Sequence, residues 1–202
     1  MSRKTIAAWL LCQAWFALTA SAQDQPAAKE SARFSHTGLK AFVGTTSFEM
    51  IAERGLKAGE GGSLGLGYGF TERFSLWLNL FGSKHAPEES EEATFEFSGL
   101  ELTLQQKFET NAPFQPYGKL GFGIYGLDDT TSPEALVGAG LSVGLGVDFF
   151  FSRHLGIGAE VVYKKLDYFQ RSLTTPEGEL LTNLSPLLNG DTVGFMLTFT
   201  VQ

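Results

Sequence analysis

The residues best able to do chemistry in this chain are three histidines and the acids near one of them. His85 lies close to Ser83 and Glu88, and a serine, a histidine and a carboxylate together can support acyl transfer. Such a triad is defined by geometry, however, and proximity in sequence does not create one. His36 and His154 lie in a leader and a short turn, apart from comparable partners. We therefore predict no catalytic residue.

Metal and nucleotide sites are also disfavoured. The acidic run at 88–92 could hold divalent cations, but it lacks the spaced oxygen ligands of a dedicated calcium loop, so a solvated loop is the simpler interpretation. The glycines at 65, 67 and 69 superficially resemble a nucleotide loop, yet they lie within an extended segment and open no helix. We predict no cofactor and no bound metal.

The N-terminus predicts export. Arg3 and Lys4 precede an apolar stretch, and Ala20-Ser21-Ala22 reads as a cleavage site, so residues 1–22 are predicted to be a signal peptide. Its removal takes away two positive charges and no acid, so the formal charge changes from −7 to −9. An acidic exported chain is a poor candidate for nucleic-acid binding. Residues 23–37 show no periodicity and are predicted to be a flexible leader.

The strongest structural pattern is strict alternation in residues 137–149. Apolar side chains alternate there with glycine, serine and aspartate, which predicts an extended strand with one apolar and one polar face. Thirteen residues at about 3.3 Å each span roughly 43 Å, and a tilt of about 45° brings this to the thickness of a hydrocarbon core. Seven further segments alternate similarly, at 39–44, 64–70, 74–80, 100–105, 119–124, 155–164 and 193–201.

The connections between these segments alternate in length. Short turns are expected at 71–73, 110–114 and 152–154, and long loops at about 48–62, 82–93, 127–134 and 168–191. Barrels of bacterial outer membranes combine short periplasmic turns with longer extracellular loops. We also expect two girdles of aromatic side chains, with Phe149, Phe150 and Phe151 at the short turns and Tyr125 and Tyr168 toward the long loops.

The polar faces of the strands carry both signs of charge. By alternation, six charged side chains should point into the interior, and they are Lys40, Glu101, Lys119, Asp148, Glu160 and Lys164. A low-dielectric interior penalises unpaired charge, so we expect these groups to form one polar network that plugs the barrel. Counting from the turn at Pro113 places Lys119 opposite Thr103 or Gln105.

The last strand completes the pattern. Thr192, Gly194, Leu197 and Phe199 resemble the β-signal read by the barrel-assembly machinery. With the strand and loop pattern, residues 38–202 resemble the outer-membrane protein β-barrel family, in particular the small OmpA/OmpX-type barrels. The resemblance implies an all-β, eight-stranded antiparallel up-and-down transmembrane β-barrel in a Gram-negative outer membrane. It also implies contact with membrane lipids and lipopolysaccharide, and with periplasmic chaperones and the assembly machinery during biogenesis.

The predicted role is structural, or one of surface interaction through the loops with a surface or host ligand, for a chain that acts as a monomer. A crowded interior argues against a general diffusion pore. The alternatives are an outer-leaflet enzyme that modifies lipid A, a narrow channel, and a soluble lipocalin-like barrel. The last is disfavoured because the face free of glycine and charge is the one expected to point outward.

Overall fold

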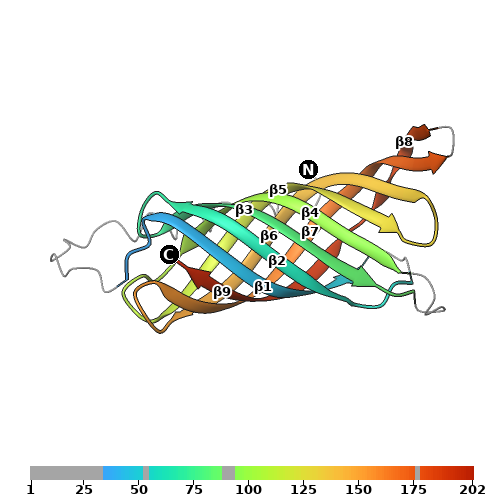
Figure 1. Ribbon diagram of the computed structural model, residues 1–202. Helices are drawn as coiled ribbons and strands as arrows, with labels where there is room; N and C mark the ends of the chain where they lie inside the picture. Colours follow the sequence, from blue (N-terminus) through green and yellow to red (C-terminus); the bar gives the residue numbers. More distant parts are fainter. Residues whose placement is uncertain (1–33, 52–54, 88–93, 176–177) are drawn as a thin grey trace, which may run out of the picture. The chain divides into compact units, whose positions relative to one another are not determined.

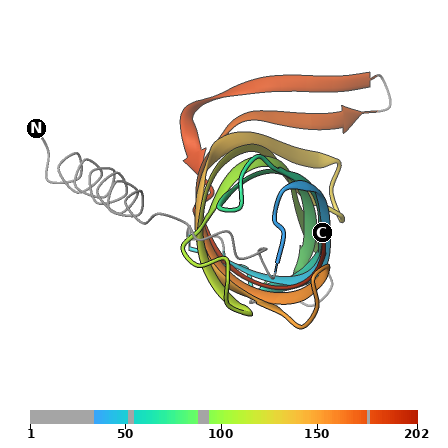
Figure 2. The ribbon, with the colours of Figure 1, turned by 90° about the vertical axis from the view of Figure 1, so that its left-hand side faces the viewer.

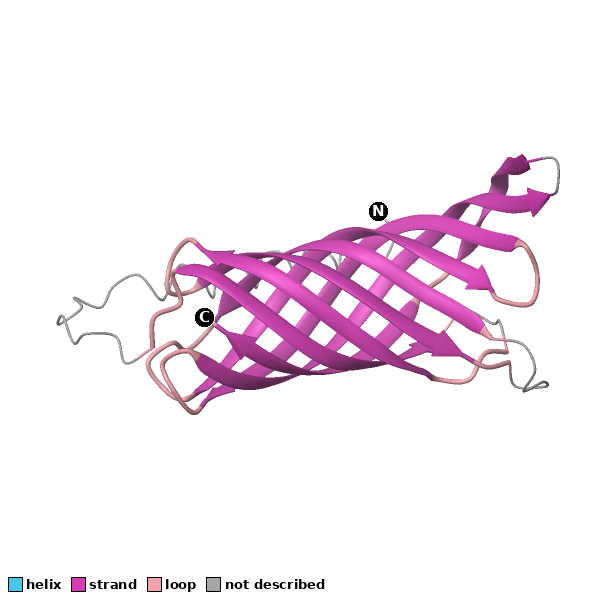
Figure 3. Ribbon diagram, in the orientation of Figure 1, coloured by secondary structure: helices cyan, strands magenta, loops and turns pink. Residues whose placement is uncertain are grey.

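The computed structural model describes residues 34–51, 55–87, 94–175 and 178–202. The predicted signal peptide and most of the predicted leader lie outside these residues. The described part consists of strands and short connections (Figure 3). Within it, no helix is long and apolar enough to cross a membrane.

Nine antiparallel strands are formed, and eight of them close into a barrel (Figure 1). The ring runs in the order β6-β5-β4-β3-β2-β1-β9-β7 and is closed by pairing of β6 with β7, while β8 pairs with β7 alone. The strands are β1 (Gly38–Met50), β2 (Gly59–Gly69), β3 (Phe74–His85), β4 (Phe95–Lys107), β5 (Phe114–Asp129), β6 (Glu134–Phe150), β7 (Leu155–Thr175), β8 (Gly178–Asn189) and β9 (Thr192–Val201). Seen along its axis, the barrel is a ring with β8 outside it (Figure 2).

Alternation along each strand decides which side chains enter the barrel. In β6, Leu141, Leu145 and Phe149 are 62%, 63% and 47% exposed, whereas Ser142 and Asp148 between them are buried. A strand turns successive side chains to opposite faces, so the apolar row of β6 lies outside and its small and polar row lies inside. The outer wall is apolar in this way except near the loop end, as lipid contact requires.

The two ends of the barrel differ in their connections. The turn end holds both termini of the ring, at Gly38 and Val201, and the turns at 70–73, 108–113 and 151–154. The loop end holds the connections at 51–58, 86–94 and 130–133. In barrels of this class the short turns face the periplasm.

The expected long loop at 168–191 is wrong. β7 continues through this region to Thr175, and β8 returns from Gly178 to Asn189 as a hairpin that projects beyond the barrel wall (Figures 1 and 2). β8 shows no regular alternation because most of it is uncovered: Leu180 and Leu181 are adjacent and both exposed, and Leu184 and Leu188 alone pack against the buried core. The sequence of β8 therefore lacks the alternation from which a strand is predicted.

The other strands also reach further toward the loop end than predicted. β5 extends to Asp129 and β6 starts at Glu134, which leaves a connection no longer than the turns at the opposite end. β3 likewise continues to His85. The alternation of loop lengths is thus weaker than expected. Residues near the rim that were predicted to lie in loops form cross-strand pairs instead, such as Asp129 with Phe95.

Candidate functional site

Three ion pairs cross the barrel interior, which we call the lumen. Lys107 Nζ lies 2.8 Å from Asp148 Oδ2, and Lys119 Nζ lies 2.6 Å from Glu160 Oε2. Lys164 Nζ donates to Glu101 Oε1. These pairs join β4 to β6, β5 to β7 and β4 to β7, strands that are not neighbours in the sheet. They act as struts between strands of the wall that are separated by one strand or by two.

All six charged residues placed in the lumen by alternation are buried there. Five of them belong to the struts, whereas Lys40 donates to Ser75 Oγ at 3.1 Å. Sequence reasoning missed Lys107, which is the partner of Asp148 and also bonds Gln115 Oε1 at 2.8 Å. The inward row of β4 runs through 101, 103 and 105, so one further step along it would have identified residue 107.

Tyrosines complete the environment of two struts. Tyr117 Oη donates to Glu160 Oε2 at 2.9 Å, and Tyr125 Oη donates to Glu101 Oε1 at 2.7 Å. Each of these carboxylates therefore has a lysine and a tyrosine as partners. Lys119 is paired with Gln105 across the sheet, one of the two positions given by counting from the turn.

Glycines on the neighbouring strand make room for these side chains. A Cβ added at Gly146 would lie 2.4 Å from the ring of Tyr117, and one at Gly144 would lie 2.9 Å from Glu160 Oε1. Such distances are too short for close-packed atoms. The inward glycines of β6 therefore leave the space that Tyr117 and Glu160 occupy.

Toward the loop end, rings replace charges. Phe48, Phe81, Phe97 and Tyr125 form a cluster in which Phe97 stacks on Tyr125 at 6.0 Å and meets Phe48 edge-on at 5.7 Å. Tyr168 and Leu166 join the same buried core. The predicted girdle was thus wrong for Tyr125, Tyr168 and Phe150, which are 2%, 0% and 2% exposed. Each lies an even number of residues from an inward position of its strand, which places it in the lumen.

Little space remains between the struts and the rings. The cavity lined by Ser63, Asn79, Lys119 and Lys164 measures about 10 Å³. That is about the volume needed for a single water. Lys164 joins the two layers, since its Nζ lies 4.3 Å from the ring centre of Phe81.

Residues 34–37 close the turn end. Phe34 and His36 are buried, and both rings lie against Phe150, at 6.0 and 5.3 Å between centres. The backbone N–H of His36 donates to Glu72 Oε2 at 2.8 Å, and its Nδ1 lies 2.8 Å from Gln202 Oε1. These four residues are the described part of the predicted leader, and they lie in the turn-end mouth of the lumen.

Ser83 and His85 are within hydrogen-bond distance, 2.9 Å from Oγ to Nε2, and Nδ1 of His85 lies 3.2 Å from the carbonyl oxygen of Lys57. Both side chains are buried on the lumen side of β3. Glu88, the third member considered, lies outside the described residues. A serine–histidine contact therefore exists, but it faces the interior rather than lipid or solvent. Among the described residues, no cluster of three or more histidines, cysteines or acids is placed to hold a metal ion.

The four residues of the predicted assembly pattern lie on β9, two on its lumen side and two on its outer side. Thr192 and Gly194 face the lumen, where a Cβ at Gly194 would lie 2.3 Å from the ring of Phe48. Leu197 and Phe199 face outward and are 50% and 40% exposed.

A closed, eight-stranded antiparallel barrel with an apolar outer wall and a polar, filled lumen is the architecture of a small transmembrane β-barrel. The family model described as outer membrane protein beta-barrel domain matches residues 11–199, and the chain belongs to this family. Its place is therefore the outer membrane of a Gram-negative bacterium. A search of curated proteins finds no match.

Solved structures share the fold at low sequence identity. Neisserial surface protein A (NspA) is similar with a TM-score of 0.61 at 13% identity, covering 82% of this chain and 97% of that one. OprG from Pseudomonas aeruginosa gives 0.53 at 19% identity, covering 85% and 96%. Ail, the attachment invasion locus protein of Yersinia pestis, gives 0.51 at 18% identity, covering 82% and 98%. At these identities the likeness concerns the fold.

Proposed function

We propose that this protein is a closed outer-membrane barrel that acts through its loop end and its outer wall, and not as a diffusion pore. The observation that carries the proposal is the filled lumen. The three struts, the ring cluster and the residues 34–37 occupy it in succession, and the cavity between struts and rings measures about 10 Å³. A solute has no continuous polar path through such an interior.

Planar-bilayer recording tests the closed state. Purified full-length protein should give no resolved conductance steps in 1 M KCl, under conditions in which a general porin gives them. Discrete steps from the wild type that vanish when Lys119 and Glu160 are both replaced by bulky apolar residues would instead establish the alternative, a narrow channel along the struts.

The interaction surface is the β7–β8 hairpin. β8 pairs on one side only, and three of its leucines, Leu180, Leu181 and Leu187, are 54–58% exposed. An unpaired strand edge is a template to which an extended peptide can add as a further strand. Ail has been solved in complex with the heparin analogue sucrose octasulfate. The present chain is acidic, so an apolar extended peptide fits its hairpin better than a polyanion.

Shortening the hairpin tests this role. Ser172 and Leu181 are cross-strand partners, so replacing residues 173–180 by Asn-Gly should close the hairpin at that pair. The barrel loses only the rim contacts of Leu173 with Glu134 and of Thr174 with Pro133. The wild type should bind a labelled octapeptide of alternating valine and threonine, and the shortened variant should not. Sucrose octasulfate should bind neither. Equal peptide binding by both proteins, at equal heat-modifiability on gels, would contradict the proposal.

Enzymatic modification of outer-leaflet lipid is the alternative, and the contact between Ser83 and His85 is what favours it. Because both side chains face the lumen, we expect His85→Ala to leave the acyl pattern of lipid A unchanged. Loss of an acyl modification in this variant alone would establish the enzyme.

The remaining partners follow from the class of protein. We propose membrane lipids and lipopolysaccharide around the outer wall, chaperones and the assembly machinery as transient partners of the β9 pattern, and a monomer as the working unit. Replacing Gly194 by leucine should impair assembly, since Phe48 occupies the space that a side chain there would need.

A further inference from the structure

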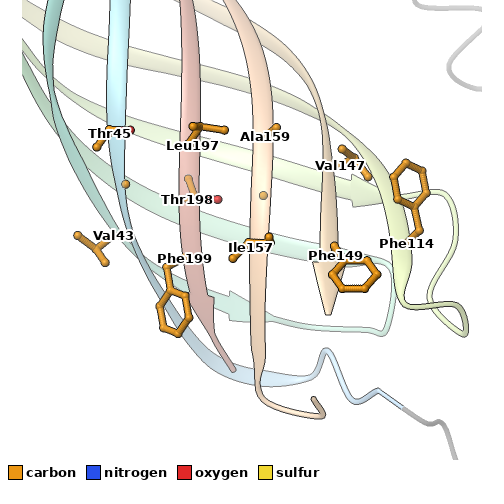
Figure 4. A pocket seen from close by; sticks show the side chains of 12 residues that line it. Val43, Thr45, Phe114, Val147, Phe149, Ile157, Ala159, Leu197, Thr198 and Phe199 are labelled. Atoms are coloured by element: carbon orange, nitrogen blue, oxygen red, sulfur yellow. The ribbon is translucent and has the colours of Figure 1, made fainter. Parts of the chain in front are cut away.

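The outer wall carries a groove in its turn-end half (Figure 4). It crosses β1, β9, β7 and β6, measures about 670 Å³ and is lined almost wholly by apolar atoms. This volume lies within the range of roughly 300–1,000 Å³ typical of small-molecule sites. The groove opens outward, where the surrounding wall contacts membrane hydrocarbon.

Strand register explains the shape of the groove. Cross-strand pairing places outward residues in rows, and one row near the turn end is bulky: Val43, Phe199, Ile157, Phe149 and Phe114. The third row, Phe195, Val161 and Leu145, is bulky as well. The row between them contains Thr45, Leu197, Ala159 and Val147. Thr45 and Ala159 are smaller than the residues of the two flanking rows, so this row leaves a trough that runs across the strands.

The residues along the trough decide what fits it. The groove is lined mainly by aliphatic and aromatic side chains, and none of its lining residues has a buried polar side-chain atom without a hydrogen-bond partner. Within a membrane there is no water to expel, so binding depends on shape and on polar contacts at the edge. A long, flexible hydrocarbon chain matches a trough of this form.

A positively charged residue lies in a turn between two strands of this face. Arg153 is exposed in the turn that joins β6 to β7, two of the strands that form the groove. The C-terminal residue holds this turn in place: Gln202 Nε2 donates to the carbonyl oxygen of Arg153 at 3.2 Å, and Gln202 N donates to that of His154 at 2.9 Å. Among the described residues, no carboxylate lies in ion-pair range of Arg153.

The geometry points to a binding site for one diacyl glycerophospholipid of the periplasmic leaflet. One acyl chain lies in the trough over Ala159, and the phosphate lies at the headgroup level next to Arg153. A guanidinium and a phosphate form a strong, charge-assisted contact, which supplies the selectivity that apolar contacts cannot supply in a membrane. Other phospholipids around the barrel exchange freely, whereas this one is retained.

Two pairs of matched variants separate this site from ordinary lipid contact. Ala159→Leu fills the trough, and Ala139→Leu makes the same change at an exposed outward position of β6 outside the groove. Arg153→Gln removes the charge at the edge of the groove, and Arg73→Gln removes a charge in another turn at the same end. Heat-modifiability on gels verifies that all four variants fold.

Native mass spectrometry of the full chain, delipidated and then incubated with palmitoyl-oleoyl phosphatidylglycerol, provides the readout. The wild type, Ala139→Leu and Arg73→Gln should retain one phospholipid. Ala159→Leu and Arg153→Gln should reduce its occupancy at least tenfold, and palmitoyl-oleoyl glycerol, which lacks the phosphate, should not be retained. Equal retention by all five proteins would overturn the site. A dimer of the protein that is present in the wild type and lost in Ala159→Leu would overturn it too, since the groove would then bind a second copy of the protein.

A photoactivatable phospholipid gives a test that needs no variant. Cross-links from an acyl-chain probe should map to Val147, Ala159 or Leu197 in peptides of β6, β7 and β9. Cross-links spread evenly around the eight strands of the wall would overturn the proposal.

Discussion

The two halves of the lumen are filled by different means. Toward the turn end, lysines and carboxylates form pairs between strands that are not neighbours in the sheet, and a tyrosine hydroxyl is a third partner. Toward the loop end, Phe48, Phe81 and Phe97 pack as a cluster of rings. We call these the charged half and the aromatic half. Both fill the lumen, but they differ in how sensitive they are to the loss of one side chain.

The difference follows from the energetics of burial. A buried charge without its partner is strongly unfavourable, so each strut requires both of its members at once. Ring packing tolerates change better, because a smaller apolar side chain loses contacts without leaving a charge unpaired. The charged half therefore constrains which strands face each other, whereas the aromatic half mainly fills volume. Four changes test this comparison.

The largest effect is expected for Lys164→Met in the charged half. It leaves Glu101 buried with Tyr125 as its remaining partner, and should lower the free energy of unfolding by about 3–5 kcal/mol. Adding Glu101→Gln should restore most of the loss, because the buried charge is then gone. Urea titration in lipid vesicles, followed by fluorescence of Trp77, measures both. A double variant no more stable than the single one would contradict the strut interpretation.

A smaller loss is expected for Phe97→Leu in the aromatic half. The change removes the contacts with Phe48, Phe81 and Tyr125 but leaves the site apolar, so we expect a loss of about 1–3 kcal/mol. The same urea titration applies. If this variant lost more stability than Lys164→Met, the contrast between the halves would be reversed.

The next effect concerns pH and the residues 34–37. Burial, with the nearby charge of Lys107, lowers the pKa of His36 from 6.5 to about 4. The unfolded chain binds a proton at higher pH than the folded one, so the neutral ring contributes its full stability above about pH 6.5. That contribution is lost as the pH falls toward 4. NMR titration of the His36 ring should give a midpoint near 4, and His36→Gln should flatten the pH dependence of unfolding within this window.

The smallest effect is expected outside the lumen. Lys84 and Glu96 form an ion pair at 3.0 Å on the outer face, with side chains 72% and 45% exposed. Exposed pairs contribute at most about 1 kcal/mol, so Lys84→Met should change stability far less than Lys164→Met. The effect should also shrink as salt is raised, which urea titrations at two ionic strengths would detect.

Much of this architecture was predictable from alternation alone. Lys119 and Glu160 were assigned to the lumen because a strand has two faces, and the wall was assigned to lipid for the same reason. The pairing of Glu101 with Lys164 was not predictable, since it depends on the stagger of strands around the closed ring. The hairpin was missed because only Leu184 and Leu188 of β8 pack against the core, which is too little to impose a period of two. Tyr125 was misplaced because an aromatic residue near a strand end was weighed by its type rather than by its position in the alternation.

β7 runs without interruption from Leu155 in the wall to Thr175 in the hairpin, over 21 residues. The part that stands outside the membrane is thus a continuation of a strand fixed inside it. A partner that adds to β8 meets a backbone already held in the extended form, so little conformational entropy is lost on binding. Because β7 is continuous, a lateral force on the hairpin is transmitted to the strand that contributes Glu160 and Lys164 to the struts. Resistance to such a force therefore comes from the struts as well as from the rim, where Arg171 of β7 pairs with Glu134.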